Sequence, residues 1–266
     1  MNARSHVRNI AVSQDGKWVV SGTKTGQVTV WNAESHTKVT EWKAHNKEVC
    51  AVDVSPDGTR IATGSVDCTL CVWSLSTGQR LLGPVKHDYW VAAVRFSPNG
   101  RLIATATWER DSVWIYDSRN DSLLVEFPVE VGSRRNQSLA WASDSKRLFA
   151  LSCHGNIHRL DVSTGTALSK WAIHSSNNPI CIALGSNDTF IAASANASTS
   201  FWDTTTHEQI GCVIERTHFI ISMAVSANYD FVTGGGKTVT LLRLRDILHS
   251  RYFDNVRVFS NHKLLR

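Results

Sequence analysis

The chain of 266 residues is 42% hydrophobic and 19% charged, which allows the core of one large domain or of two ordinary ones. It has only 5 prolines and 16 glycines, so the composition excludes a fibrous or a disordered chain. Between Arg243 and Arg266, 6 basic residues against 2 acidic ones supply +4 of the net charge of +5. The basic character therefore belongs to the end of the chain and does not predict a nucleic-acid-binding face.

The cysteines and the hydropathy indicate the cellular setting. Of 6 cysteines, only Cys68 and Cys71 are closely spaced, and no second close pair accompanies them. We expect these two side chains in small apolar sites, with zinc or a disulfide as the alternative. No apolar leader follows Met1, and no apolar run reaches membrane-spanning length. The sequence predicts an intracellular protein, cytoplasmic or nuclear, with reduced thiols and no membrane contact.

From the N-terminus onward, the predicted elements are short strands separated by turns. The first turn falls at Gly16, and the pattern is clearest from Glu48 to Ser74. An apolar run there predicts a strand at Val49–Val54. It is followed by a turn at Ser55-Pro56-Asp57-Gly58 and by two further strands at Ile61–Ser65 and Thr69–Trp73.

Two markers repeat along the whole chain. The turn position recurs every 41–45 residues, at Gly16, Gly58, Gly100, Ser145, Asp188 and Tyr229. The end of the third strand recurs every 40–44 residues, at Trp31, Trp73, Tyr116, Leu160, Trp202 and Leu242. The apolar stretches Lys38–Trp42 and Leu168–Trp171 indicate a fourth strand in each unit. Four strands per unit of this length are typical of a propeller blade, so we predict an all-β propeller.

At these residues the chain resembles the WD-repeat family. The matching motifs are Ser55-Pro56-Asp57-Gly58, Ser97-Pro98-Asn99-Gly100, Trp202-Asp203 and the opening histidines His45, His87 and His174. The tandem arrays of fungal signalling proteins look similar. The resemblance implies six four-stranded blades within residues 1–254, with repeats at about 5–44, 45–86, 87–131, 132–173, 174–217 and 218–254.

A truncated seven-bladed propeller is the alternative. Val256–Leu265 echoes Val94–Ile103, so residues 255–266 are either a basic C-terminal tail or a vestigial repeat.

One constellation could be read as a catalytic triad or as a structural network. His45, Thr63, Asp67 and Trp73 supply an imidazole, a hydroxyl, a carboxylate and an indole. Their spacing resembles the structural tetrad of the family, in which a chain of hydrogen bonds satisfies four buried polar groups. Fragments of the set recur in other repeats, whereas a catalytic triad should occur once. We therefore favour the structural role.

Charged residues also fall on the first strands, which are expected to line the central channel. Asp53 and Arg95 occupy one position in adjacent repeats, and alanine holds that position in the other four. The pair could bind a polar ligand, but a salt bridge is the favoured interpretation. No second carboxylate joins them, so the sequence offers no acid–base pair for hydrolysis.

The loops at one rim provide the candidate binding residues. In this family the connections that enter a blade and those between second and third strands open onto the same rim, the usual partner-binding face. Exposed aromatic and arginine side chains resemble protein-binding hot spots. The rim candidates are Tyr89, Trp90, Trp108, Glu109, Arg110, Arg134 and Arg135. The alternative is that Trp90 caps its blade and that the two arginines are simply solvated.

These patterns predict a non-catalytic platform that binds a protein or peptide on the rim. No cofactor, metal or small-molecule substrate is expected, and no enzyme activity. The first alternative is a nucleic-acid or chromatin adaptor, which would need a basic rim. The second is an enzyme on a propeller scaffold, which would need acids or metal ligands converging at the channel mouth.

Overall fold

The computed structural model describes residues 5–108, 112–129, 138–152, 154–173, 179–185, 187–226, 228, 230–235 and 238–253. The first three blades comprise β1 (Val7–Val12), β2 (Trp18–Thr23), β3 (Gln27–Asn32), β4 (Lys38–Lys43), β5 (Val49–Val54), β6 (Arg60–Ser65), β7 (Thr69–Ser74), β8 (Arg80–Lys86), β9 (Val91–Phe96), β10 (Leu102–Thr107), β11 (Val113–Asp117) and β12 (Leu123–Phe127).

The last three blades comprise β13 (Leu139–Trp141), β14 (Arg147–Leu151), β15 (Asn156–Asp161), β16 (Thr166–Ala172), β17 (Pro179–Leu184), β18 (Phe190–Ala195), β19 (Ser198–Asp203), β20 (Gln209–Glu215), β21 (Ser222–Val225), β22 (Asp230–Gly235) and β23 (Thr238–Arg243).

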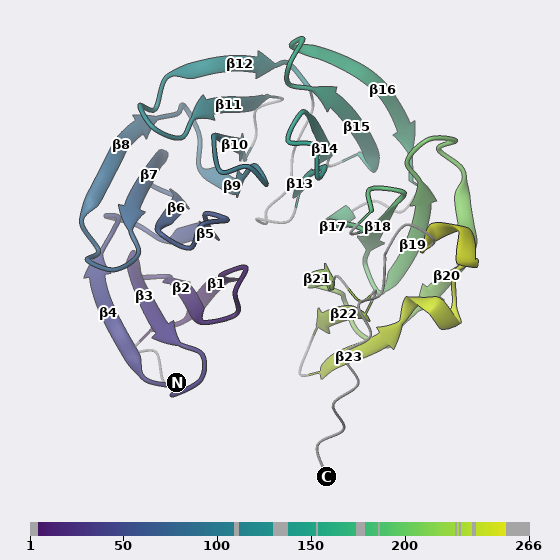
Figure 1. Cartoon of the computed structure of the whole chain (residues 1–266), viewed down its shortest axis with the longest axis horizontal. Helices are drawn as coiled ribbons and strands as arrows, with labels where there is room; N and C mark the ends of the chain where they lie inside the picture. Colours follow the sequence, from purple (N-terminus) through teal and green to yellow (C-terminus); the bar gives the residue numbers. More distant parts are fainter. Residues whose placement is uncertain are drawn as a thin grey trace.

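Consecutive antiparallel strands form each blade, and the first strand of every blade lies nearest the centre of the ring (Figure 1). The predicted all-β propeller of six blades is therefore confirmed. Five sheets have four strands, and the sixth has three within the described residues. After β23 the chain forms two short 3-10 helices, Leu244–Asp246 and Ser250–Tyr252, and lies beside the fifth blade (Figure 1).

The turns after the first strands explain why the repeat can be read from the sequence. In the second blade the amide of Gly58 donates to the carbonyl of Ser55 at 2.8 Å, and Gly58 has a φ of +69°. This left-handed backbone suits glycine. Gly16 and Gly100 repeat the conformation, and Ser145 and Asp188 adopt it in the fourth and fifth blades. The turn marker therefore identifies one backbone position in five blades.

The core consists of apolar layers between successive blades. Leu70 and Val72 of β7 pack against Val91, Val94 and Phe96 of β9, and all five side chains are buried. This stacking continues from β1 through β5, β9, β13 and β17 to β21. Burying both faces of each sheet in this way supplies most of the stabilisation of the fold.

The outer faces of the first and last blades differ from those layers. Ile10 and Val12 of β1 are 60% and 58% exposed, whereas Val52 and Val54 at the same positions of β5 are 0% and 9% exposed. In β23, Val239 and Leu241 are likewise exposed. The ribbons of these two blades do not meet in Figure 1. Among the described residues, β1 and β21 do not pack against each other as the first strands of neighbouring blades do.

Candidate functional site

The structure brings His45, Thr63, Asp67 and Trp73 together in the second blade. The indole N–H of Trp73 donates to Oγ1 of Thr63 at 2.8 Å, and that hydroxyl lies 2.7 Å from Nε2 of His45. Nδ1 of the same ring lies 3.1 Å from both carboxylate oxygens of Asp67. The imidazole therefore donates to the acid through Nδ1 and accepts from threonine through Nε2.

Hydrogen bonds favour the charged form of the carboxylate in this network. Burial alone would raise the pKa of Asp67, but hydrogen bonds from His45 and Thr69 hold it well below its ordinary value. The carboxylate also accepts the amide of Asn46 at 3.0 Å, which ties the blade entry to the loop after β6. Since Thr63 is fully buried and already has partners, the hydroxyl has no open approach for a substrate.

Other blades hold fragments of the same network. Trp31 donates to Oγ of Ser21 at 3.0 Å in the first blade. In the third blade the hydroxyl of Tyr116 lies 3.4 Å from Nε2 of His87, and Oγ1 of Thr105 is buried without a hydrogen-bond partner. The longer side chain of Tyr116 thus contacts His87 directly, without Thr105 between them. These partial copies support a structural role for the set.

The two channel candidates lie one blade apart and contact each other. Nη1 of Arg95 is 3.8 Å from Oδ1 of Asp53, at the outer limit for a salt bridge. The shorter contact of Asp53 is with the backbone, since its Oδ2 accepts the amide of Phe96 at 2.7 Å. Burial raises the pKa of Asp53 in spite of Arg95. The acid therefore joins the second blade to the third, and Arg95 remains partly exposed.

Two of the rim candidates, Trp90 and Trp108, form an aromatic cluster, and Tyr89 directly precedes Trp90 in the chain. Tyr89 and Trp90 are 38% and 43% exposed, and Trp108 is half-buried. The rings of Trp90 and Trp108 are 5.4 Å apart between centroids and tilted by 53°. The amide of Trp108 donates to the carbonyl of Trp90 at 2.9 Å, which holds the two loops together. The other candidates, Glu109, Arg110, Arg134 and Arg135, lie outside the described residues.

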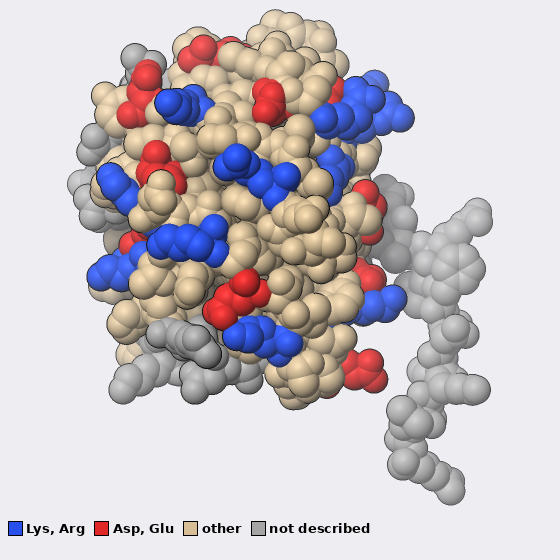
Figure 2. Space-filling view, turned by 90° about the vertical axis from the view of Figure 1, so that its left-hand side faces the viewer, with Lys and Arg blue, Asp and Glu red and all other residues tan. Residues whose placement is uncertain are grey.

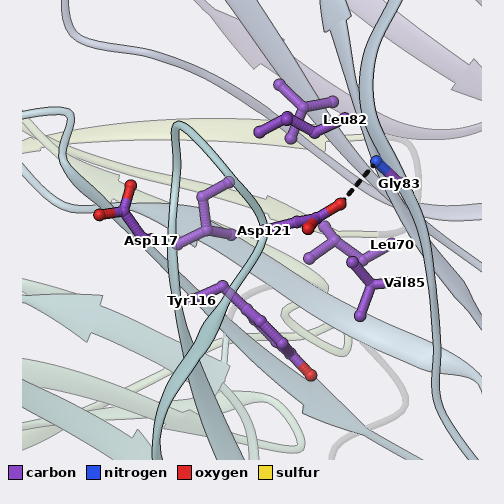
Figure 3. Close-up of a pocket in the computed structure, with 9 residues that line it drawn as sticks. Leu70, Leu82, Gly83, Val85, Tyr116, Asp117 and Asp121 are labelled. Atoms are coloured by element: carbon purple, nitrogen blue, oxygen red, sulfur yellow. Dashed lines mark hydrogen bonds between the residues drawn. The ribbon is translucent and has the colours of Figure 1, made fainter.

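The described residues line two hollows of interest. The one in Figure 3, between the second and third blades, has a volume of about 10 Å³ and apolar walls that include Leu70, Leu82 and Val85. Oδ2 of Asp121 closes it by accepting the amide of Gly83 at 3.1 Å, so it has room for a single water at most. The other, beside Arg216 at the rim of the sixth blade, has a volume of about 480 Å³.

The sequence interpretation did not select Arg216. A signal was nevertheless present, because Arg216 precedes Met223 by the same number of residues as His45 precedes Val52 and His87 precedes Val94, and these three hold one position in their first strands. The amides of all three make one equivalent bond, to the carbonyls of Ala197, Gly26 and Cys68 respectively.

Among the described residues, no three His, Cys, Asp or Glu side chains are grouped so that they could hold a metal ion. In that part of the chain there is also no helix with the length and apolar character needed to span a membrane.

With this geometry established, the chain can be compared with known proteins. The family model described as "WD domain, G-beta repeat" matches residues 2–32, 36–74 and 80–117. These segments correspond to the first three blades, and the fourth to sixth blades lie outside the match. No curated protein matches the chain.

Proposed function

Because the chain belongs to the WD-repeat β-propeller family, we propose that it is a non-catalytic platform that binds a protein or peptide on the rim beside Trp90 and Trp108. Propellers of this family are typically non-catalytic interaction scaffolds. The observation that carries the proposal is the aromatic cluster of Trp90 and Trp108, with the exposed Tyr89 next to Trp90 in the chain. Large rigid aromatic side chains give binding area at low entropic cost, as hot spots require.

The charge distribution favours a protein partner over a nucleic acid. Figure 2 shows basic and acidic side chains interspersed on the side of the molecule that lies at the left of Figure 1. A nucleic-acid-binding face would instead gather positive charge in one stripe. We propose that the partner supplies an apolar or proline-like surface to the aromatic cluster. We expect no cofactor and no small-molecule substrate.

The test is a selection of peptides from a display library on the intact chain. For the selected peptides, the double variant Trp90→Ala, Trp108→Ala should bind at least tenfold more weakly, because hot-spot truncations cost about 2 kcal/mol or more. Its melting temperature should stay within a few degrees of the parent, because Trp90 is 43% exposed and the ring it contacts, Trp108, is removed with it.

Lys146 provides the control, since it is exposed and lies in a turn at the opposite end of the blades. Lys146→Ala should leave binding unchanged. Asn99 is a poor control even though it lies in a similar turn, because its Oδ1 accepts from Ser97 and Arg101. Selected peptides that bind the tryptophan double variant as tightly as the parent would place the binding surface elsewhere.

A further inference from the structure

The sixth blade keeps half of the buried network seen in the second blade. Arg216 stands at the position of His45, because its amide donates to the carbonyl of Ala197 as that of His45 donates to Gly26. Thr233 stands at the position of Thr63, since the two pair with Met223 and Val52 at one place in their first strands. A basic side chain and the hydroxyl of the network are therefore both present.

The acid and the indole are missing from this copy. The connection Val66-Asp67-Cys68 of the second blade is replaced by Gly236-Lys237, which contains no carboxylate. Leu242 pairs with Phe231 where Trp73 pairs with Ile61, so no indole fills the centre. Beside Arg216 there is a space.

That space is the larger hollow at the rim, here named the Arg216 pocket. Its volume of about 480 Å³ is within the range of ligand sites in proteins. Polar side chains contribute to its lining beside the apolar Ile220, namely those of Glu215, Arg216, His218, Thr233, Thr238 and Thr240. The hydroxyl and guanidinium donors in this lining favour an acceptor-rich ligand.

The arginine itself lacks an internal acceptor. Its Nη2 is buried and has no hydrogen-bond partner among the described residues. In the same part of the chain, no carboxylate forms a salt bridge with Arg216. Arg216 as a whole is half-buried, so part of the desolvation of its charge is not offset by pairing. In the second blade, Asp67 instead accepts a hydrogen bond from Nδ1 of the His45 imidazole.

We propose that the Arg216 pocket binds a carboxylate from outside the chain, namely the side chain of an acidic residue in a peptide. This external acid takes the role that Asp67 has in the second blade. A carboxylate suits the pocket better than a phosphate does, because Glu215 at its edge repels a dianion more strongly than a single charge. The pocket opens on the same rim as the aromatic cluster but three blades away, so the two sites can be tested separately.

The experiment uses a fluorescein-labelled seven-residue peptide of serine and glycine with one central glutamate. Its matched versions carry glutamine or phosphoserine at that position. Fluorescence anisotropy at low salt should show at least fivefold tighter binding of the glutamate peptide than of the glutamine peptide. Equal affinity for these two peptides would overturn the proposal, and so would a preference for phosphoserine over glutamate.

Variants locate the site. Arg216→Gln should abolish the preference for glutamate, and Thr233→Val should reduce it. Glu215→Gln should tighten binding of the glutamate peptide about twofold. The control Arg101→Gln removes the same charge from an exposed turn at the opposite end and should keep the preference. An equal loss in the Arg101 and Arg216 variants would mean non-specific attraction and would overturn the site.

The variant Arg216→Gln can also be tested without a ligand, through its melting temperature. Because Nη2 of Arg216 has no partner, Arg216→Gln should leave the melting temperature unchanged or raise it. A marked fall would reveal an internal partner for the guanidinium and would contradict the proposal. A failure of peptide selection at Trp90 and Trp108 would not bear on this result, since the two surfaces share no residue.

Discussion

His45 and Thr63 are joined by a 2.7 Å hydrogen bond between the imidazole Nε2 and the hydroxyl, with only 4% and 0% of the two residues exposed. Replacing His45 with alanine leaves Thr63 and Asp67 each short of one partner in a dry environment. We expect a loss of about 1–3 kcal/mol in the free energy of unfolding, measured by urea denaturation. His6→Ala is the control, because that histidine is exposed before β1. Equal losses in the two variants would show that the network adds nothing.

Asp67 should make stability depend on pH in the acid range. Its pKa is lowered in the folded protein by hydrogen bonds that outweigh burial, so the carboxylate stabilises the fold above its unfolded pKa of about 4. This contribution is lost as the pH falls through the lower, folded pKa. Asp67→Asn should therefore unfold at a lower temperature than the parent at pH 6, and the difference should shrink progressively below pH 4. A difference that stays constant down to pH 2 would mean that Asp67 stabilises the fold through its size and hydrogen-bond geometry and not through its charge.

The third blade responds to acid in another range. Burial lowers the pKa of His87 to about 4, although the nearby Asp88 acts in the opposite direction. The unfolded chain therefore takes up a proton at about pH 6.5, while the folded chain resists until about pH 4. The parent should lose up to about 3 kcal/mol of stability between these two values, at about 1.4 kcal/mol per pKa unit.

His87→Gln provides the comparison for that loss. The variant cannot gain the proton, so the slope of unfolding free energy against pH between 6.5 and 4 should be smaller than in the parent. The contact with the hydroxyl of Tyr116 is weakened as well, which lowers stability by the same amount at every pH. Only the slope therefore tests the role of titration, and parallel curves for the two proteins would count against it.

The sequence was sufficient for the repeat and much of the second-blade network, because both depend on local chemistry. A turn that needs a left-handed residue selects Gly58, and a buried indole needs a hydroxyl such as Thr63 within reach. The path of the chain after β23 could not be read in this way, since Leu244 and Tyr252 find their places against Phe190, far along the chain. The Arg216 pocket was missed for a similar reason. Its lining residues come from the end of β20, the loop that follows it, β22 and β23, and they meet only in the folded chain.

The open faces of the ring give the last prediction. Ile10 and Val52 occupy one position in adjacent first strands, yet the first is 60% exposed and the second is fully buried. Val52→Ala should cost about 2 kcal/mol, because it removes buried methyl groups and leaves a cavity against the first blade. Ile10→Ala removes more carbon atoms but should cost less than about 0.5 kcal/mol, since these atoms already contact water. Denaturation of the two variants side by side measures this difference. A cost for Ile10→Ala as large as that for Val52→Ala would show that this face is covered in solution, as closure of the ring by residues 255–266 or by a further blade would require.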